Sequence, residues 1–307
     1  MARLFLTGGQ GMVGRNLRDH PGLSRWEVLA PARTDLDLSD AHALQDWLAR
    51  HRPDAVVHAA GLVGGIQANM AEPVRYLAEN ARIGLNVIEA CRAARVPVLI
   101  NLSSSCVYPA GLGHGLPEDR ILTGPLEPTN EGYALAKIMA MRLIEYATRE
   151  NPDLAWHTLI PCNLYGPHDK FDPRHSHLVP AIIHKLHQAK QAGKDTVEIW
   201  GDGEARREFM YAPDLAGAIL RALDDPNALP PVMNVGPGRD HSINDYYRIT
   251  AEVIGWQGRF THDLDRPVGM RRKLLDVARQ NAWGWAPQTP LRDGIAATYA
   301  HYLKDAR

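Results

Sequence analysis

Residues 3–14 read RLFLTGGQGMVG, a short apolar run that ends in a series of glycines. The run predicts a buried β-strand, and residues 12–19 have the spacing of a helix. Three of the glycines have separate physical uses: one permits the tight turn, one lets a pyrophosphate approach the backbone, and one lets helix and strand pack closely. The helix N-terminus adds free N–H groups and a positive dipole end for the phosphates. The stretch predicts a dinucleotide site, although a glycine-rich turn of purely structural use has the same pattern. The predicted contacts are Gly8, Gly9, Gln10, Gly11, Met12, Val13 and Gly14.

Strands and helices alternate along the chain that follows this turn. This alternation predicts βαβ units, and therefore a parallel sheet covered on both faces. Because such crossovers are nearly always right-handed, the expected fold is α/β with a doubly wound parallel sheet. The predicted strands are residues 27–30, 54–58, 97–102 and 156–160, and the predicted helices are residues 41–50, 72–94 and 133–149.

The regular alternation of predicted strands and helices ends after residue 166. Residues 167–177 are rich in Pro, His, Asp and Arg, which is typical of a functional loop. A helix over 178–194, a strand over 196–200 and a helix over 213–224 follow, and the last third is mixed. We expect a smaller C-terminal lobe that rests on the sheet. The predicted division is a dinucleotide-binding domain of residues 1–165, to which 210–236 return, and a substrate-binding lobe of residues 166–209 and 237–307.

Composition excludes several classes of protein. The 307 residues include 34 Lys and Arg against 35 Asp and Glu, a net charge of -1 that argues against a dedicated nucleic-acid binder. Three cysteines in a chain of this length do not make a disulfide framework. With no secretory start and no apolar run of about 18 residues, we expect a cytoplasmic enzyme with no membrane partner. The histidines near residue 177 lack zinc-like companions, so we expect no metal site.

The end of the second strand indicates which dinucleotide binds. An acidic residue there would favour the 2′-hydroxyl of NAD, but this strand is followed by Arg33. A guanidinium suits a 2′-phosphate, so we expect NADP(H), with a solvated surface arginine as the alternative. Asp37 lies close by in sequence and is a candidate acceptor for the adenine amino group.

A second constellation points to proton chemistry. Tyr133 and Lys137 are four residues apart and share one face of a predicted helix. A nearby ammonium is expected to lower the pKa of the tyrosine, so that it exchanges a proton with a carbonyl or an alcohol. Ser104, just past the fourth strand, can hydrogen-bond the same oxygen. Lys137 can also hold the nicotinamide ribose.

With these motifs in place, the chain resembles the extended short-chain dehydrogenase/reductase family, whose fold is a Rossmann sheet. Within that family it is most similar to the branch that makes GDP-L-fucose, and the resemblance covers almost the whole length. The motifs that carry it are VGGI at 63–66, SSCVYP at 104–109, LEPTNE at 126–131, NLYGPHD at 163–169, WGDG at 200–203, REF at 207–209 and RKLLD at 272–276.

The resemblance implies an NADPH-dependent 3,5-epimerase and 4-reductase that converts GDP-4-keto-6-deoxy-D-mannose to GDP-L-fucose. Ser104, Tyr133 and Lys137 match the reductase triad of that branch. Cys106 and His177 match its acid/base pair, with Cys106 as the base and His177 as the acid. Epimerisation needs such a pair because one group takes a proton from one face of the sugar and another returns it on the opposite face.

The resemblance also implies ligand contacts, and it has departures. Residues Pro161, Asn163, Leu164 and His177 match positions at the cofactor, and Lys185, Trp200 and Arg207 match positions at the nucleotide sugar. Lys185 replaces the Arg of other members, and Gln10 stands where some of them place an Arg. Val268 stands where many members have an Asp that binds substrate, which puts one sugar or guanine contact in doubt.

Two other functions and one assembly follow from the same residues. A C4-reductase of a related GDP-4-keto-deoxy sugar, such as a dideoxyhexose or a 6-deoxyheptose, with or without epimerase activity, would have the same triad, and Val268 leaves this alternative open. A non-catalytic NADP(H) sensor or scaffold would need only the glycine turn. The family resemblance suggests a homodimer formed through the helices at 72–94 and 133–149.

Overall fold

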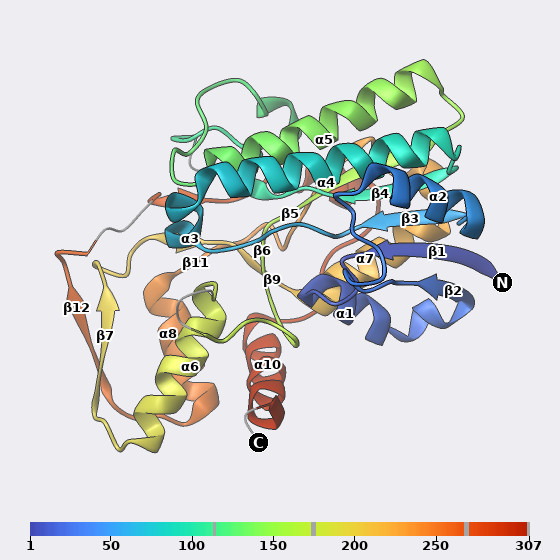
Figure 1. Cartoon of the computed structure of the whole chain (residues 1–307). Helices are drawn as coiled ribbons and strands as arrows, with labels where there is room; N and C mark the ends of the chain where they lie inside the picture. Colours follow the sequence, from blue (N-terminus) through green and yellow to red (C-terminus); the bar gives the residue numbers. More distant parts are fainter. Residues whose placement is uncertain (113–114, 173–175, 267–269, 306–307) are drawn as a thin grey trace.

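A six-stranded parallel sheet forms the centre of the molecule in the computed structural model, which describes residues 1–112, 115–172, 176–266 and 270–305 (Figure 1). The chain passes from β1 to β2 on one side and then from β2 to β3 on the other, so the strand order reverses at β1. In such sheets the ligand crevice lies outside the carboxyl ends of the strands at this reversal. In spatial order the strands are β10 (Val232–Val235), β5 (Ala155–Pro161), β4 (Val98–Leu102), β3 (Ala55–His58), β1 (Ala2–Thr7) and β2 (Trp26–Leu29).

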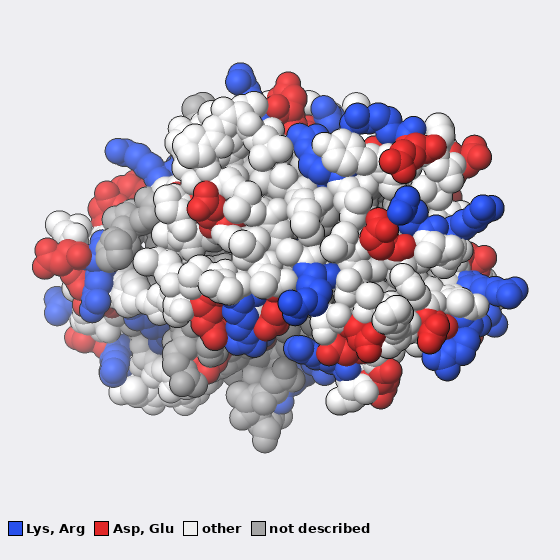
Figure 2. Space-filling view, turned by 45° about the horizontal axis from the view of Figure 1, so that its top comes forward, with Lys and Arg blue, Asp and Glu red and all other residues white. Residues whose placement is uncertain are grey.

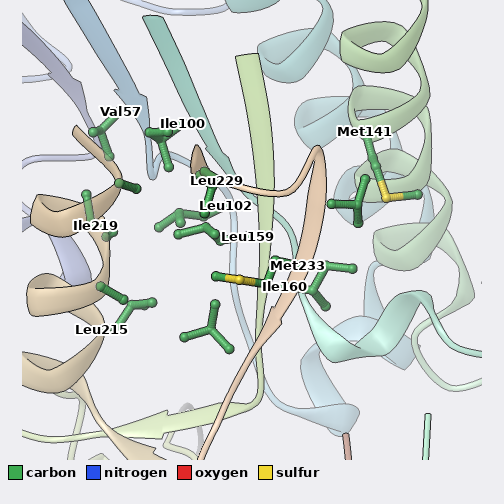
Figure 3. Packing of buried hydrophobic residues seen from close by; sticks show 14 of the residues in the cluster. Val57, Ile100, Leu102, Met141, Leu159, Ile160, Leu215, Ile219, Leu229 and Met233 are labelled. Atoms are coloured by element: carbon green, nitrogen blue, oxygen red, sulfur yellow. The ribbon is translucent and has the colours of Figure 1, made fainter. Parts of the chain in front are cut away.

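Helices cover both faces of the sheet, which confirms the doubly wound α/β fold (Figure 1). Because strand side chains alternate between faces, Phe5 packs in the cluster beneath α2 (Ala41–His51), α4 (Pro73–Ala93) and α5 (Glu131–Glu150). Its neighbours Leu4 and Leu6 pack in the other cluster, with α1 (Met12–Asp19) and α7 (Ala212–Asp224). Figure 3 shows this second cluster, in which Val57 and Ile100 of the sheet face α7.

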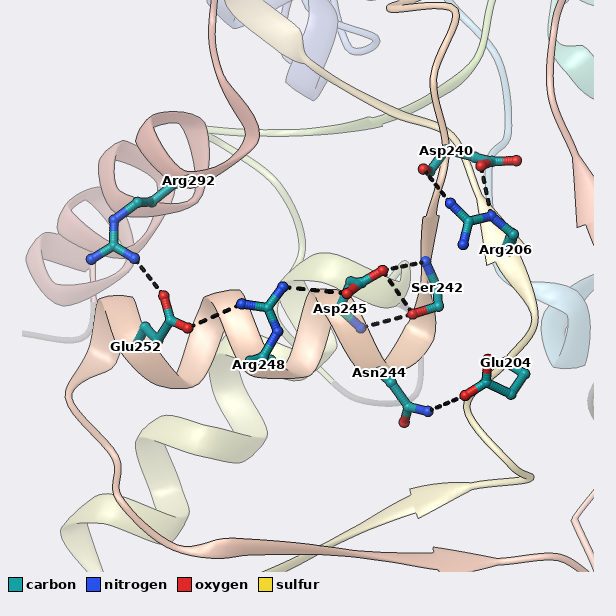
Figure 4. Close-up of polar contacts among 9 residues, drawn as sticks. All are labelled: Glu204, Arg206, Asp240, Ser242, Asn244, Asp245, Arg248, Glu252 and Arg292. Atoms are coloured by element: carbon teal, nitrogen blue, oxygen red, sulfur yellow. Dashed lines mark hydrogen bonds and ion pairs between the residues drawn. The ribbon is translucent and has the colours of Figure 1, made fainter.

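A third hydrophobic cluster lies in a lobe below and beside the sheet, built from α6 (Leu178–Gln191), α8 (Ile243–Ile254) and α10 (Leu291–Asp305). Ser242 and Asp245 form a capping box at the start of α8. Glu252 accepts from Arg248 and from Arg292, which ties α8 to α10 (Figure 4). The remaining elements are α3 (Ile66–Ala71), α9 (Ala278–Ala282), β6 (Asn163–Tyr165), β7 (Thr196–Trp200), β8 (Arg206–Arg207), β9 (Phe209–Tyr211), β11 (His241–Ser242), β12 (Arg259–Asp263) and β13 (Arg272–Lys273).

Several contacts join the lobe segments to the sheet. Strand β6 pairs with β9, and the buried Glu208 carboxylate between β8 and β9 accepts from the backbone N–H groups of Gly238 and Leu275 at 2.8 and 3.0 Å. Burial raises the pKa of Glu208 to about 7. Leu275 and Trp283, which belong to the predicted lobe, pack in the hydrophobic cluster between the sheet and helices α1 and α7. The division of the chain into two domains stays a prediction.

Candidate functional site

The glycine turn between β1 and α1 combines three close-packed glycines. Gly8 has φ +71°, a conformation that side chains disfavour, and a Cβ on it would lie 2.7 Å from Ala60 N. A Cβ on Gly14 would lie 2.3 Å from the Gly8 carbonyl oxygen, and one on Gly9 would lie 2.8 Å from the Ala30 Cβ. The chain's own backbone and neighbouring strand therefore require these three glycines.

Gly11 differs because the protein leaves its outer side open. It is the residue that begins α1, and a Cβ there would meet only the Gly8 oxygen, at an ordinary distance of 3.4 Å. Nothing in the chain itself demands glycine at this position. Open space at a helix N-terminus is a cradle for a phosphate, which approaches the backbone most closely where no Cβ projects. The residues present fit a dinucleotide pyrophosphate.

Arg33 and Asp37 lie in the loop after β2. Arg33 is exposed, and within the described part of the chain no carboxylate forms an ion pair with it. The Asp37 carboxylate accepts from the Ser39 N–H at 2.9 Å and from its hydroxyl at 2.7 Å. These two hydrogen bonds lower the pKa of Asp37. The structure leaves the Arg33 guanidinium available for a phosphate, while the adenine contact of Asp37 stays a prediction.

Ser104, Cys106 and Tyr133 come together above the carboxyl end of β4. Ser104 precedes the short 3₁₀ turn Ser105–Val107, and its hydroxyl accepts from the Cys106 N–H at 3.3 Å. The same hydroxyl is hydrogen-bonded to Tyr133 from α5, and the charge of Cys106 acts on that tyrosine. The sequence prediction placed these residues in one site, and the Ser104 hydroxyl contacts both of the others here.

The expected lowering of the Tyr133 pKa is wrong for this structure. Burial, and then the negative charge of an ionised Cys106, raise the pKa of Tyr133 well above its usual value, and the Ser104 hydrogen bond opposes them only in part. The Lys137 ammonium lies 5.8 Å from the ring centroid and donates to the Leu102 carbonyl at 2.9 Å, so it does not bond the phenol. Tyr133 is therefore arranged to keep its proton, which suits a proton donor.

Lys137 is buried among neutral polar groups. Burial lowers the pKa of Lys137 to about 8. Beneath it, the Thr7 hydroxyl accepts from the Ala60 N–H at 3.2 Å and contacts His58 Nδ1 at 2.8 Å. Burial, reinforced by the charge of Lys137, lowers the pKa of His58 to about 3, which keeps this imidazole neutral. Thr7 and His58 were not predicted as site residues; their positions as the last residues of β1 and β3 are the signal that would have indicated them.

Asn130, the residue before α5, is a third residue that the sequence prediction missed. Its side-chain Nδ2 donates to the Cys106 Sγ at 3.3 Å. It lies within the LEPTNE motif, but no spacing rule links an asparagine in a loop to a cysteine on a different strand end.

His177 lies on another segment, immediately before α6. Burial, and then the charge of Lys170, lower the pKa of His177. Nearby, burial raises the pKa of Asp169 to about 7, and its Oδ2 is buried without a partner in the described part of the chain. The contacts described here do not join His177 to Cys106, so their pairing across a sugar ring stays a prediction.

The predicted sugar-nucleotide residues lie in the lobe. Arg207 is half-buried, burial lowers its pKa, and its NH1 donates to the Arg206 carbonyl at 2.8 Å. Its neighbour Arg206 is bound to Asp240 at 2.7 Å (Figure 4). Arg272 shares the same carboxylate. Among the described residues no carboxylate neutralises Arg207. This guanidinium is therefore available to an anionic ligand.

Trp200 and Lys185 lie on either side of the β7–β12 ribbon. Trp200 is 51% exposed, with the Arg266 guanidinium 5.0 Å from its ring centroid. Lys185 donates to the Glu198 carbonyl and lies 6.0 Å from the Tyr247 ring centroid. Val268 falls outside the described residues.

Pro161 is the last residue of β5. The other two residues that the sequence predicts at the cofactor, Asn163 and Leu164, lie in β6. Asn163 begins β6, and its Nδ2 donates to the Glu208 carbonyl at 3.1 Å, which fixes it beside β9. Leu164 packs against the cluster of the sheet. No group of three or more His, Cys, Asp or Glu in the described ranges is arranged to hold a metal, and no described helix is long and apolar enough to span a membrane.

A model of the NAD dependent epimerase/dehydratase family matches residues 4–236, which include the glycine turn, Tyr133 and Lys137. The chain belongs to this family. Two relatives match nearly from end to end. GDP-L-fucose synthase of Azorhizobium caulinodans is 53% identical over 301 residues, covering 98% of this chain and 96% of the relative. GDP-L-colitose synthase of Yersinia pseudotuberculosis is 46% identical over 303 residues, covering 99% and 98%.

The family fold extends to solved structures. A GDP-L-fucose synthetase from Naegleria fowleri bound to NADP superimposes with a TM-score of 0.89 at 25% identity, covering 99% of this chain and 93% of that chain. The similarity therefore includes the lobe as well as the sheet, and the expected membership of the extended short-chain dehydrogenase/reductase fold is confirmed.

The contrast between Gly11 and Gly14 yields a prediction. Gly11→Ala should leave the midpoint of thermal unfolding near the wild-type value and weaken NADPH binding at least tenfold, because its methyl group fits the protein but blocks the phosphate. Gly14→Ala places a Cβ against backbone and should lower the free energy of unfolding by about 2 kcal/mol. Fluorescence titration and thermal melts measure both, and a Gly11→Ala protein that binds NADPH normally would contradict the assignment.

Proposed function

We propose that the protein is an NADPH-dependent 3,5-epimerase and 4-reductase that converts GDP-4-keto-6-deoxy-D-mannose to GDP-L-fucose. The observation that carries this proposal is that Ser104 contacts both a half-buried thiol, Cys106, and a buried tyrosine that keeps its proton, Tyr133. A simple reductase needs the tyrosine alone, whereas epimerisation needs an additional base. The relative from Azorhizobium, at 53% identity, has the name of an enzyme for this reaction.

The first half of the reaction inverts two carbons of the sugar. Protons on C3 and C5 are acidic because the C4 ketone delocalises the resulting charge onto its oxygen. At each carbon in turn, Cys106 takes one proton and His177 returns one on the opposite face; exchange with water deprotonates Cys106 and reprotonates His177 before the second inversion. The enolate oxygen then lies at Ser104 and Tyr133, whose hydroxyl groups donate hydrogen bonds to the developing charge.

The second half reduces C4. Bound NADPH supplies a hydride, and Tyr133 gives its proton to the oxygen at C4. The raised pKa of Tyr133 suits this direction of transfer, because the phenol is protonated before the ketone is reduced. We assign to Lys137 the roles of holding the ribose hydroxyls and of supplying the proton that restores Tyr133, while the open Gly11 cradle and the exposed Arg33 hold the phosphates.

We assign the cofactor to the domain of residues 1–165 and 210–236, and the nucleotide sugar to the lobe of residues 166–209 and 237–307. Arg207 and Lys185 bind the diphosphate; Arg207 binds it in bidentate fashion, and Lys185 as a point charge. The exposed face of Trp200 packs against the sugar or the base. Arg207 forms no ion pair with a carboxylate among the described side chains, whereas the charge of Glu198 acts on Lys185, so the diphosphate mainly neutralises Arg207.

The alternative function is reduction at C4 of a related GDP-4-keto-deoxy sugar, with or without epimerisation. The similarity to a GDP-L-colitose synthase at 46% identity favours this alternative more than any contact in the described site does. The contact of Asn130 with Cys106 favours the epimerase, since a pure reductase has no use for a polar contact to that sulfur. A sensor or scaffold role is disfavoured by the complete Ser104, Tyr133 and Lys137 set.

We propose that the protein is a homodimer in which α4 and α5 pack against the same helices of a second copy. Apolar side chains are exposed along these helices: Val74 is 78% exposed, and Leu85 and Leu135 are 44% and 41% exposed. In Figure 2, which brings this side of the molecule forward, the middle of the face is largely uncharged and the charged side chains gather toward its edges. All three cysteines are free, which suits the reducing cytoplasm that we propose as its compartment.

Light scattering tests the dimer. The wild-type protein should have twice the chain mass of 34.0 kDa. Val74→Glu combined with Leu135→Glu should produce monomers, because it buries unpaired charges in an apolar interface. Leu264→Glu is the matched control, since Leu264 is 72% exposed and lies outside both helices. A wild-type protein that scatters as a monomer at micromolar concentration would overturn the assembly.

Product analysis by NMR tests the function. With purified GDP-4-keto-6-deoxy-D-mannose and NADPH, we expect GDP-L-fucose; in heavy water without NADPH, we expect deuterium at C3 and C5. Tyr133→Phe should abolish NADPH oxidation while NADPH still binds, whereas Cys106→Ser should reduce exchange at least a hundredfold and retain NADPH binding. A product reduced at C4 with no deuterium at C3 or C5 would establish the alternative reductase instead.

The pH dependence of reduction should follow Lys137. Its pKa of about 8 means that the ammonium is present below pH 8 and is lost as the pH rises through 8, while Tyr133 remains protonated. The single-turnover rate of NADPH oxidation should therefore be level below pH 8 and fall above it. In Lys137→Arg, whose guanidinium stays charged, the residual rate should lack this fall. A wild-type rate that is level to pH 10 would contradict the role of Lys137.

A further inference from the structure

Asn130 occupies the position at which an asparagine side chain ordinarily caps a helix. Here the side chain makes no hydrogen bond to the first turn of α5. The helix begins through the backbone instead, since the Ala134 N–H donates to the Asn130 carbonyl at 3.0 Å. The carboxamide is turned away from the helix, and its Nδ2 donates to the Cys106 Sγ at 3.3 Å. A stabilising cap is given up for a contact with one sulfur atom.

The oxygen of the same carboxamide adds to the loss of stability. The Asn130 Oδ1 is buried and has no hydrogen-bond partner among the described residues. An unpaired buried oxygen destabilises the folded state. A residue selected for stability alone would use both ends of its amide, so the contact with Cys106 is the property that distinguishes this side chain.

An amide N–H that points at sulfur stabilises the thiolate more than the neutral thiol, because a hydrogen bond to a charged acceptor is the stronger one. The thiolate is also the form that acts as a base or a nucleophile. Two titratable groups of α5 belong to the same site. Tyr133 is close enough to be affected by its charge, and the Lys137 ammonium is directed to the Leu102 carbonyl. Neither is a hydrogen-bond donor to Cys106 in the described contacts.

We propose that Asn130 is a positioning residue whose hydrogen bond to the Cys106 sulfur stabilises the thiolate form and aims the sulfur at the sugar; its role in turnover rests on the proposed function. In the proton transfer the C–H bond breaks and an S–H bond forms. The electron pair passes into the enolate, whose charge lies on the oxygen at C4. The sulfur loses its charge in this step, and the Asn130 hydrogen bond weakens as the proton arrives.

The direct test is the rate at which iodoacetamide alkylates Cys106 near neutral pH, followed by mass spectrometry of its peptide. The assay needs neither substrate nor cofactor. Asn130→Ala should slow alkylation about tenfold or more, because the thiolate loses its donor. Thr129→Ala is the matched control and should react at the wild-type rate. Thr129 lies in the same turn, and its hydroxyl donates to Glu127 at 3.4 Å rather than to the sulfur.

A second variant keeps the test decisive if Asn130→Ala does not fold. Asn130→Asp has the same shape, and Asp is as favourable as Asn at the start of a helix, but its carboxylate offers no donor and repels a thiolate. Alkylation should be slower in Asn130→Asp than in the wild type. Wild-type alkylation rates in a folded Asn130→Ala or Asn130→Asp protein would overturn the proposal.

Deuterium exchange at C3 and C5 separates this proposal from the proposed function. Slower alkylation together with slower exchange supports both. Slower alkylation with wild-type exchange supports the Asn130 contact and removes Cys106 as the base of the reaction. NADPH binding should be unchanged in both Asn130 variants, since the contact lies at the sulfur rather than at the glycine turn.

Discussion

Parallel pairing of six strands places the last residue of every strand on one edge of the sheet. The candidate site depends on this constraint more than on any single bond. Thr7 ends β1, His58 ends β3, and Ser104 follows β4, so three segments far apart in sequence deliver polar side chains to one place. Helix α5 then needs only to cross that edge for Tyr133 and Lys137 to complete the cluster.

Burial gives this cluster its pattern of charge. It keeps a proton on Tyr133 and keeps His58 neutral, while it weakens the hold of Lys137 on its proton. An ionised Cys106 makes ionisation of Tyr133 still less favourable. The cluster therefore places a sulfur atom beside a phenol that keeps its proton. A base for the first half of the reaction and an acid for the second half can be present together, without rearrangement between the two.

The sequence predicted those parts of the site that depend on local spacing. The glycine turn, the Tyr133–Lys137 pair on one helix face and most elements before residue 224 follow from periodicity, and the structure has them within a few residues. Contacts between distant segments had no local pattern: Thr7 with His58, and Asn130 with Cys106. The direction of the Tyr133 pKa failed for the same reason, since burial is a tertiary property. The sequence pattern also left α8, α10 and β10 unassigned, because short or mixed apolar runs do not reveal which surface they cover.

The sixth strand of the sheet has a consequence for how the protein is made. Strand β10 pairs with β5, yet Val232 follows Pro161 only after the chain has formed α6, β7 and α7. During translation, the hydrogen-bonding edge of β5 is complete on one side and bare on the other until the last quarter of the chain leaves the ribosome. A bare edge of buried residues is a template for pairing with other nascent chains. A ribosome that stalls before residue 232 would therefore release an aggregation-prone chain. Chaperones are most needed to protect the nascent chain during the time between the synthesis of β5 and that of β10.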